Sequence, residues 1–373
     1  MKIVVAPDSF KESLSAIDAS KVMKQAIQKE MPNATVELYP MADGGEGILD
    51  TLVYATNGRF IDVTVSGALG NKIHTQYGVL GDDETVVIEI AKIAGLMQVN
   101  RSKRNPMNTT TFGIGETLID AIDDGFRKFI IGLGGSATND GGLGMLQALG
   151  VKFFDEHGRD VLPNGSSLLK VNALDLEQLH PKLHECELVI ASDVSNPLCG
   201  ENGATYVFGA QKGALEEQMH LLDTAMQRYA NLIESEVGQS FQHVEGAGAA
   251  GGLGFAFLFL GSRLQSGAEL VAETIGLREA IQTADWVITG EGRSDKQTLF
   301  GKVPAYVAQL AQQYGAKPLL LSGSLGEGYE SLFSSFISCF SIVNVPMSLE
   351  QAMADAKKLL YQQTRNVIRL IQS

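Results

Sequence analysis

Acidic, basic and glycine residues follow four short apolar runs that the sequence predicts to be β-strands, "KIVVAP", "VELYP", "WVIT" and "LLL". The polar residues are Asp8, Ser9 and Lys11 after the first run, Asp43 and Glu46 after the second, Gly290 to Asp295 after the third and Ser322 to Ser324 after the fourth. One such cluster is typical of a turn or a helix cap. Because the carboxyl ends of parallel strands meet at one edge of a sheet, four clusters together predict a shared ligand crevice.

The carboxylates of these clusters are candidate ligands of Mg²⁺, which prefers oxygen donors and binds directly or through water. The predicted ligands are Asp43, Glu46, Glu291 and Asp295. Capping of helix N-termini, worth about 0.3–1 kcal/mol, is the alternative role of the first two. Arg293 could hold an anion with its planar fork. Lys302 lies where a helix is predicted to start, a position that disfavours a cation, so it is expected to bind phosphate with Gly290 and Gly292.

A second candidate site is the segment 130–150, which has six glycines between Gly132 and Gly144 and no lysine or arginine. Backbone N–H groups, hydroxyls and a helix N-terminus can hold a phosphate without a lysine. The predicted phosphate contacts are Gly134, Gly135, Ser136 and Thr138. Asp140 in the same segment is expected to repel a bare phosphate, which favours a metal-bridged one. A tight strand–helix junction is the alternative, and no Walker A motif is present.

Two further stretches carry residues suited to binding or proton transfer. Asp193 follows the apolar run "ELVIA", so it could serve as a general base or a metal ligand, with Asn196 near it. An Asx-turn before Pro197 is the alternative. The densest basic stretch, "RSKR" at 101–104, is followed by threonines and could bind a carboxylate or a phosphate through Arg104 and Thr110. A solvated loop is the alternative for this stretch.

Composition narrows the classes of protein and partner. The chain of 373 residues has 43 acidic and 29 basic side chains and a net charge of −14, which argues against nucleic acid and anionic membranes as partners. Its three cysteines are widely spaced without a C-x-x-C motif, as expected for reduced thiols in the cytoplasm. The longest apolar run, 253–261, is too short to span a bilayer, and the N-terminus does not resemble a signal peptide.

The order of the predicted elements indicates an α/β protein with a discontinuous domain. Strand and helix patterns alternate near both ends of the chain, which favours a doubly wound parallel sheet of the flavodoxin or Rossmann kind. Consecutive strand patterns without a helix follow residue 58, which favours a mixed sheet. We therefore expect one domain from residues 1–60 and 265–373, an inserted mixed-sheet α/β domain from 61–264, and an active cleft between them. Two contiguous domains divided near residue 150 are the alternative.

Seven sequence blocks together resemble the bacterial glycerate kinase family that lacks a Walker A motif. The blocks are "APDSFKESLSA", "MADGGEG", "RNPMNTTTFGIGE", "GLGGSATNDGG", "ASDVSNPLCG", "GAGAAGGLG" and "TGEGRSDKQTLFGKVP". The resemblance implies ATP-dependent phosphorylation of D-glycerate with Mg²⁺ in the cytoplasm, by a two-domain protein with its site between the domains, and it favours 2-phosphoglycerate over 3-phosphoglycerate. The chain departs from the family at Glu12, where a glycine is typical.

Phosphoryl transfer mainly requires positioning and neutralisation of charge, which suggests roles for the candidates. Asp193 is the first candidate to accept the proton of the glycerate hydroxyl and Asp8 the second. Lys11 and Arg293 would stabilise the transferred group. Arg104 would pair with the glycerate carboxylate, and the other predicted substrate contacts are Thr110, Asn196 and Ser9. A kinase for another small hydroxy acid, or a sensor of sugar acids or nucleotides without turnover, is the alternative. The sequence does not predict the oligomeric state.

Overall fold

The computed structural model describes all 373 residues, which divide into two compact units. Unit 1 comprises Met1–Asp43, Asp50–Thr56 and Ser266–Ser373, and unit 2 comprises Gly44–Leu49 and Asn57–Gln265. The short stretch Gly44–Leu49 belongs to unit 2 because its backbone is hydrogen-bonded there. The Gly44 carbonyl accepts from Gly134, and the N–H groups of Gly47 and Leu49 donate to Glu89. The expected limit lay between residues 60 and 61, whereas unit 2 begins at Asn57 and also includes Gly44–Leu49.

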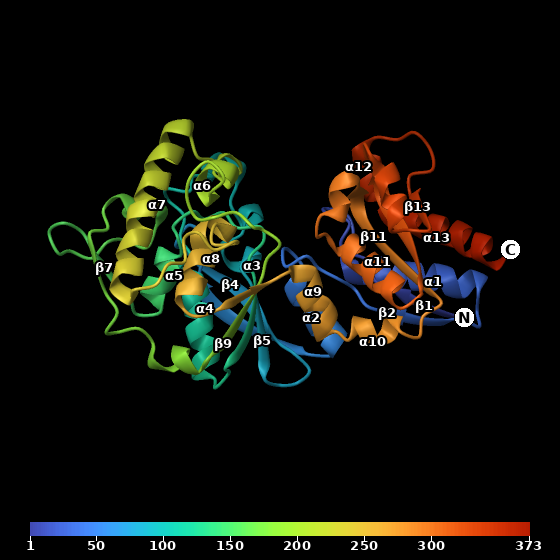
Figure 1. The fold of residues 1–373 in the computed structure, drawn as a ribbon, viewed down its shortest axis with the longest axis horizontal. Coiled ribbons are helices and arrows are strands. Elements are labelled where there is room, and N and C mark those ends of the chain that lie inside the picture. Colours follow the sequence, from blue (N-terminus) through green and yellow to red (C-terminus); the bar gives the residue numbers. More distant parts are fainter. The chain divides into compact units, whose positions relative to one another are not determined.

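Both ends of the chain contribute to one five-stranded parallel sheet in unit 1, as predicted. Its order is β13-β12-β11-β1-β2, so the chain places β2 on one side of β1 and later places β11, β12 and β13 in the reverse direction on the other side (Figure 1). The strands are β1 Lys2–Val5, β2 Thr35–Leu38, β11 Trp286–Ser294, β12 Lys317–Leu325 and β13 Ser338–Ser341. The reversal places a topological switch point between β1 and β11, where ligands of open parallel sheets bind.

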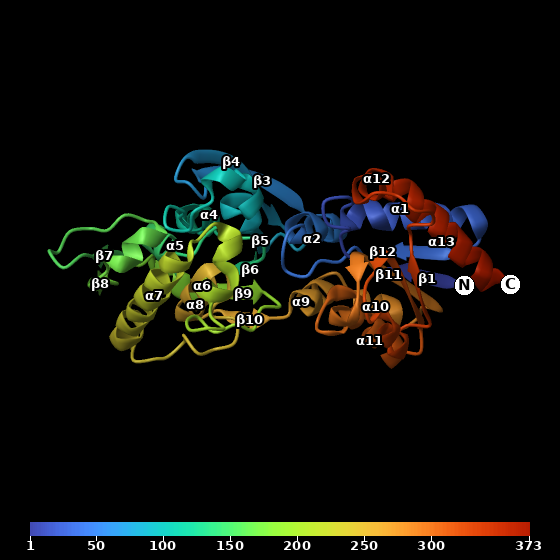
Figure 2. The same cartoon turned by 90° about the horizontal axis from the view of Figure 1, so that it is seen from above.

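Helices cover both faces of this sheet (Figure 2). Helices α1 Ala16–Glu30 and α13 Ala356–Gln372 lie on one face, where Leu319 and Leu321 of β12 join their core, while α11 Val303–Gln313 packs on the other face against Leu320. This alternation of side chains along β12 is the period of a strand. The remaining helices are α2 Ile48–Thr56, α9 Gly267–Thr274, α10 Leu277–Ile281 and α12 Leu349–Ala354. Helices α12 and α13 are separated at Asp355.

Unit 2 contains a six-stranded mixed sheet in the order β10-β9-β6-β5-β4-β3, which confirms the predicted mixed pattern. Antiparallel pairs join β3, β4 and β5, and parallel pairs join β5, β6, β9 and β10. The strands are β3 Arg59–Ser66, β4 Lys72–Val79, β5 Thr85–Glu89, β6 Lys128–Gly132, β9 Glu187–Ala191 and β10 Arg263–Gln265, with a separate hairpin of β7 Lys152–Phe154 and β8 Ala173–Asp175.

The apolar run 253–261 lies in a buried helix of unit 2, where Phe255 and Phe257 are wholly inaccessible to solvent. No helix of the chain has the length and apolar content needed to cross a membrane. The helices of unit 2 are α3 Ala91–Ala94, α4 Phe112–Asp123, α5 Leu143–Ala148, α6 Ala204–Phe208, α7 Glu216–Val237 and α8 Ala249–Phe259. The 3₁₀ helices of the chain are η1 Leu96–Gln98, η2 Arg101–Lys103, η3 Gly165–Leu169, η4 Pro181–Glu185, η5 Ala210–Lys212, η6 Lys296–Leu299 and η7 Tyr329–Ser334.

Candidate functional site

One cavity of about 670 Å³ lies at the switch point of the parallel sheet in unit 1. The residues that reach it from the four strand ends include Asp8 after β1, Asp43 after β2, Glu291 of β11 and Ser324 of β12. The prediction that these strand ends share a crevice is therefore confirmed. The opposite wall is apolar and comes from the segment 342–356, which includes Met347, Leu349 and Met353.

Two carboxylates lie close together in this cavity. Burial and the neighbouring Asp43 raise the pKa of Asp8 to about 8, although the Ser9 N–H and Lys11 oppose the rise. The Ser9 N–H donates to Asp8 Oδ1 at 2.6 Å, and the Asp8 N–H donates to the Gly290 carbonyl at 2.8 Å. Lys11 is largely exposed, and its Nζ is 3.8 Å from Asp43 Oδ2. Ionisation of Asp8 is therefore disfavoured by its burial and by the neighbouring carboxylate.

Glu291 is 7% exposed and is held by the protein itself. Its Oε1 accepts hydrogen bonds from Ser294 Oγ at 2.8 Å and from Thr298 Oγ1 at 2.7 Å. Its Oε2 is 3.6 Å from Lys302 Nζ. Glu291 thus lies beside the lysine at the cavity wall with Oε1 engaged by two hydroxyls, and its role as a direct metal ligand stays a prediction.

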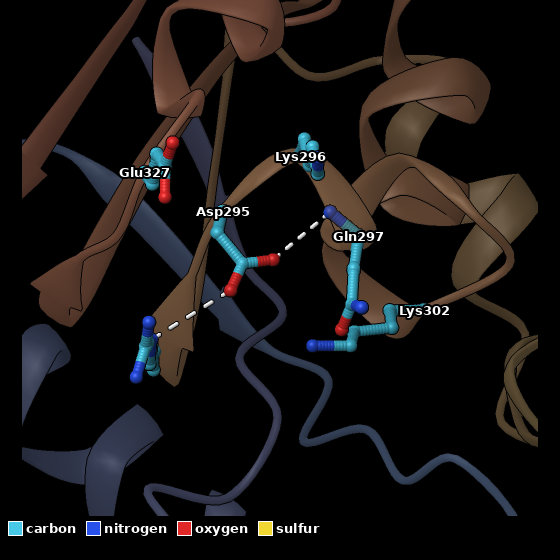
Figure 3. Close-up of a pocket in the computed structure, with 6 residues that line it drawn as sticks. Asp295, Lys296, Gln297, Lys302 and Glu327 are labelled. Carbon is cyan, nitrogen blue, oxygen red and sulfur yellow. Dashed lines mark hydrogen bonds and ion pairs between the residues drawn. The ribbon is translucent and has the colours of Figure 1, made fainter.

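A second hollow of about 500 Å³ adjoins the end of β11 and is lined by Arg293, Asp295, Lys296, Gln297, Lys302 and Glu327 (Figure 3). Asp295 caps η6: its Oδ1 accepts from the Gln297 N–H at 2.9 Å, and its Oδ2 is 3.6 Å from Arg293 Nε. No three His, Cys, Asp or Glu side chains of the chain are gathered as a metal site. The predicted set of four carboxylate ligands is therefore not assembled, since Glu291 and Asp295 have these other partners.

Glu12, which also lines the cavity, has a backbone φ of 61° in the left-handed region. Such a conformation is unfavourable for a residue with a Cβ and is readily adopted by glycine. This backbone conformation explains why a glycine is typical at this position of the family that the sequence resembles. The side chain departs from the pattern, but the backbone of this turn beside Lys11 does not.

The glycine-rich segment of unit 2 begins after β6 and packs closely against the loop before α2. A Cβ on Gly134 would lie 2.3 Å from the Gly45 Cα, so no side chain fits there. Gly135 has a φ of 73° and is exposed, whereas Ser136 and Thr138 are buried. Thr138 is wholly inaccessible, so its predicted phosphate contact is not available in this arrangement.

The glycine-rich segment contains no lysine or arginine, but Lys212 of η5 contacts it. The Lys212 Nζ donates to Ser136 Oγ at 3.0 Å and to the Thr138 carbonyl at 2.6 Å. Burial lowers the pKa of Lys212 to about 7, and Asp140 opposes this effect. Sequence reasoning missed this residue, because 76 positions separate it from Ser136 and only its small neighbours, Ala210 and Ala214, hint that it is buried.

Asp140 lies inside unit 2 and stabilises the segment instead of facing a ligand. Its Oδ2 accepts from the Thr111 N–H at 2.9 Å and from Thr111 Oγ1 at 2.8 Å, and the N–H groups of Gly142 and Gly144 also donate to this carboxylate. Burial raises its pKa, and these hydrogen bonds oppose the rise. The expectation that Asp140 would repel a bound phosphate is therefore not supported by its position.

The predicted substrate contacts Arg104 and Thr110 are engaged in local structure. Arg104 Nε donates to the Val99 carbonyl at 3.2 Å and its Nη2 to the Leu96 carbonyl at 3.0 Å. Thr110 is 4% exposed, and its Oγ1 accepts from the Phe112 N–H at the start of α4. These polar groups satisfy backbone groups of this unit, and the contacts of both residues with substrate stay predictions.

The other predicted residues of unit 2 lie nearer its surface. Asp193 is exposed two residues beyond the end of β9. Asn196 is half-buried, and its Nδ2 donates to the Asn202 carbonyl at 2.8 Å, which closes the following turn. Glu46 is exposed before α2, whereas the buried acid at this point is Glu89, which accepts from two N–H groups of the loop and was not singled out by the sequence.

Comparison with known proteins identifies the family of this chain. Residues 3–372 match the model of the glycerate kinase family. The chain belongs to the glycerate kinase family. It is therefore a phosphotransferase, and kinase membership implies ATP as the phosphoryl donor. A glycerate kinase of Halalkalibacterium halodurans is 45% identical over 98% of this chain and 97% of its own length.

Two further relatives are similar over nearly their whole length. A glycerate 2-kinase of Escherichia coli is 41% identical over 98% of this chain and 97% of its own length. A crystal structure from Salmonella typhimurium LT2, described provisionally as glycerate kinase 2, matches with a TM-score of 0.89 and 42% identity, covering 100% of this chain and 98% of that one. The discontinuous α/β fold of this chain is thus also that of a family relative.

Proposed function

We propose that the protein transfers the γ-phosphoryl group of ATP to D-glycerate, and that the cavity of unit 1 takes part in this transfer. The observation that carries the proposal is the gathering of two neighbouring carboxylates, Asp8 and Asp43, with three cations on one cavity at a switch point. Phosphoryl transfer requires a metal-bound phosphate chain and positive charge around the transferred group. Lys11, Arg293 and Lys302 are suited to supply that charge.

The Asp8 and Asp43 carboxylates fit the Mg²⁺ that accompanies ATP. Burial next to a like charge raises the pKa of Asp8, and a divalent cation would remove the cost of ionising both groups. Mg²⁺ is commonly held by one or two carboxylates together with substrate phosphates, so a cluster of three protein ligands is not required. The ion supplies neutralisation of phosphate charge. Asp8 is the second candidate for the general base from sequence alone. Its place beside Asp43 suits it better to holding Mg²⁺.

Within the cavity, Lys302 is held by Glu291 and Arg293 by Asp295, so both cations are pre-positioned. Positioned charges stabilise a transition state better than mobile ones because they need little reorganisation. Ser9, which donates its N–H to Asp8, lines the same wall and is proposed to contact substrate. Gly290 and Gly292 let the backbone of β11 pass close to its neighbours, since a Cβ on Gly290 would lie 2.1 Å from the Leu321 carbonyl oxygen.

Asp193 of unit 2 remains the proposed acceptor of the glycerate hydroxyl proton, and Gly134 to Ser136 remain proposed anion contacts. Asp193 is exposed and follows a buried strand, which is where catalytic acids of parallel sheets are found. We favour 2-phosphoglycerate as the product because the relative from Escherichia coli is named glycerate 2-kinase.

A coupled assay of ADP release with ATP, Mg²⁺ and D-glycerate tests the proposal. The expected result is ADP release that requires all three components, with 2-phosphoglycerate identified by ³¹P NMR. Turnover with another small hydroxy acid but not with D-glycerate would assign a different kinase substrate. Binding of both ligands without ADP release would instead indicate a sensor, and release of 3-phosphoglycerate would correct the product.

A further inference from the structure

Lys212 is a buried cation without a carboxylate partner. Its side chain is part of a residue that is 3% exposed, and its Nζ donates only to a hydroxyl and a carbonyl, Ser136 Oγ and the Thr138 oxygen. The carboxylate that acts on it electrostatically is Asp140, whose own hydrogen bonds come from Thr111, Gly142 and Gly144. Burial disfavours the ammonium form of Lys212, so an anion bound beside the glycine-rich segment would stabilise that form.

The segment that Lys212 contacts has unused hydrogen-bond donors. Ser136 Oγ accepts from the ammonium, so its own hydrogen is left to donate elsewhere. The backbone N–H groups of Gly135 and Ser136 donate to no group of the protein, whereas those of the flanking Gly134 and Ala137 do. Gly135 is exposed and Ser136 is 6% exposed, so the segment lies at the surface of unit 2 at Gly135.

Two wholly buried side-chain atoms of the same segment are also unpartnered, Thr138 Oγ1 and Asn139 Oδ1. Buried polar atoms are almost always hydrogen-bonded in folded proteins. The hydrogen-bonding capacity of this segment is thus not consumed within the protein, although these two buried atoms are not themselves offered as ligand contacts.

We propose that Lys212 is the positioning cation of an oxyanion subsite formed by Gly135 and Ser136. The ammonium fixes Ser136 Oγ as a donor toward the bound oxyanion, and the oxyanion balances the buried charge. The ligand is a phosphate oxygen or a carboxylate, both of which the proposed glycerate kinase reaction supplies, and the inference rests on that function for its physiological ligand. Lys212 acts through the segment and does not itself transfer a proton or a phosphoryl group.

The charged and titratable groups near Lys212 come from three elements. Asp140 of the glycine-rich segment acts on it electrostatically and favours the ammonium form. Arg104 packs through its backbone against Gly213, and its guanidinium is bound to two carbonyls. Tyr229 of α7 donates to the Gly141 carbonyl and lies under the influence of Asp140. None of these groups is a second cation or an anion in direct contact with the ammonium.

Binding of D-glycerate and of sulfate, measured by calorimetry on the full chain, tests the inference. Neither probe changes its charge between about pH 6.5 and about pH 9, so a loss of affinity in this range reports on the protein. We expect one probe to lose affinity by up to about tenfold per pH unit once Lys212 deprotonates. A response to sulfate that Lys212→Arg abolishes assigns a phosphate oxygen to the subsite, and such a response to D-glycerate alone assigns the carboxylate. A response that Lys212→Arg retains reports on another group, such as Asp8, and counts against the subsite.

Variants separate this role from a structural one. Lys212→Met should weaken the responding probe at least tenfold and raise the KM of the corresponding substrate, and Lys212→Arg should remove the pH dependence. Ser136→Ala should weaken the same probe, and it tests the inference even if Lys212→Met does not fold. Lys152→Met, at an exposed lysine of β7, is the matched control.

The proposed subsite would be refuted by three results together. These are unchanged affinities and KM values in folded Lys212→Met, the same in Ser136→Ala, and a flat pH profile of probe affinity for the wild type. This outcome is distinguishable from failure of the proposed function, because the binding measurement does not depend on turnover. A protein that binds sulfate through Lys212 but does not release ADP would retain the subsite and lose the kinase proposal.

Discussion

Replacement of Asp8 by asparagine should make the protein more stable than the wild type at alkaline pH. The raised pKa means that the folded protein keeps a proton on Asp8 up to about pH 8, whereas the unfolded chain releases it near 3.8. The folded state therefore binds more protons between these values, and the free energy of unfolding falls as the pH rises through this window. Asparagine has nearly the same shape and can still accept from the Ser9 N–H, but it has no charge to lose.

The size of the effect follows from the same shift. A change of pKa from 3.8 to about 8 corresponds to roughly 6 kcal/mol when Asp8 alone is considered. Because Asp43 is coupled to it, the protons are released by the pair, and we expect the variant to gain about 2–4 kcal/mol over the wild type between about pH 5 and about pH 8. Urea unfolding in the presence of a chelator, at several pH values, measures this difference.

Magnesium provides the second arm of this experiment. Mg²⁺ added at about pH 8 should raise the stability of the wild type by mass action and have little effect on Asp8→Asn. Asp160→Asn, at an exposed position of unit 2, is the control and should leave both responses unchanged. Parallel pH dependences of the wild type and Asp8→Asn would refute the reasoning, because they would mean that Asp8 is ionised without cost.

Three other substitutions have defined outcomes. Glu12→Gly should raise the midpoint of thermal unfolding, by about 0.5–1 kcal/mol in stability, because it relieves a left-handed backbone, and an unchanged or lower midpoint would contradict this. Asp140→Asn should lower the free energy of urea unfolding by about 1–3 kcal/mol, since an amide cannot accept from all the donors around it, and a neutral effect would show that they find other partners. Asp193→Asn should lower kcat by roughly 10²–10⁴-fold in the ADP-release assay with circular dichroism unchanged, and a near-normal kcat would remove Asp193 from the mechanism.

Most strands and helices were predictable because their side chains follow simple periods. Ser15 caps the start of α1, with the Asp18 N–H donating to Ser15 Oγ at 3.0 Å, and a serine three residues before an acid is a pattern readable from sequence. The glycine-rich end of β11 was not predicted as strand, since glycine has little β propensity. It pairs with β12 up to Ser294, because bare glycine backbones permit the close approach of the two strands.

The candidate site was predictable where one strand end could be compared with another, and not where partners are distant in sequence. Asp8, Asp43 and Glu291 line one cavity because parallel strands end at one edge. Lys212 was not predicted as a site residue because its contact with Ser136 depends on where the tertiary fold places η5. Thr110 was assigned to substrate because a sequence does not reveal that a hydroxyl serves the backbone of the next helix.

The central claim is that Asp8 and Asp43 hold the metal of the bound nucleotide at the switch point of the parallel sheet. A crystal structure with Mn²⁺ and a non-hydrolysable ATP analogue tests it most directly, since manganese gives an anomalous signal. A single strong anomalous peak is expected between these two carboxylates and the terminal phosphates. Lys11, Arg293 or Lys302 is expected to contact the phosphate oxygens. A manganese peak and phosphates bound away from this cavity would contradict the central claim.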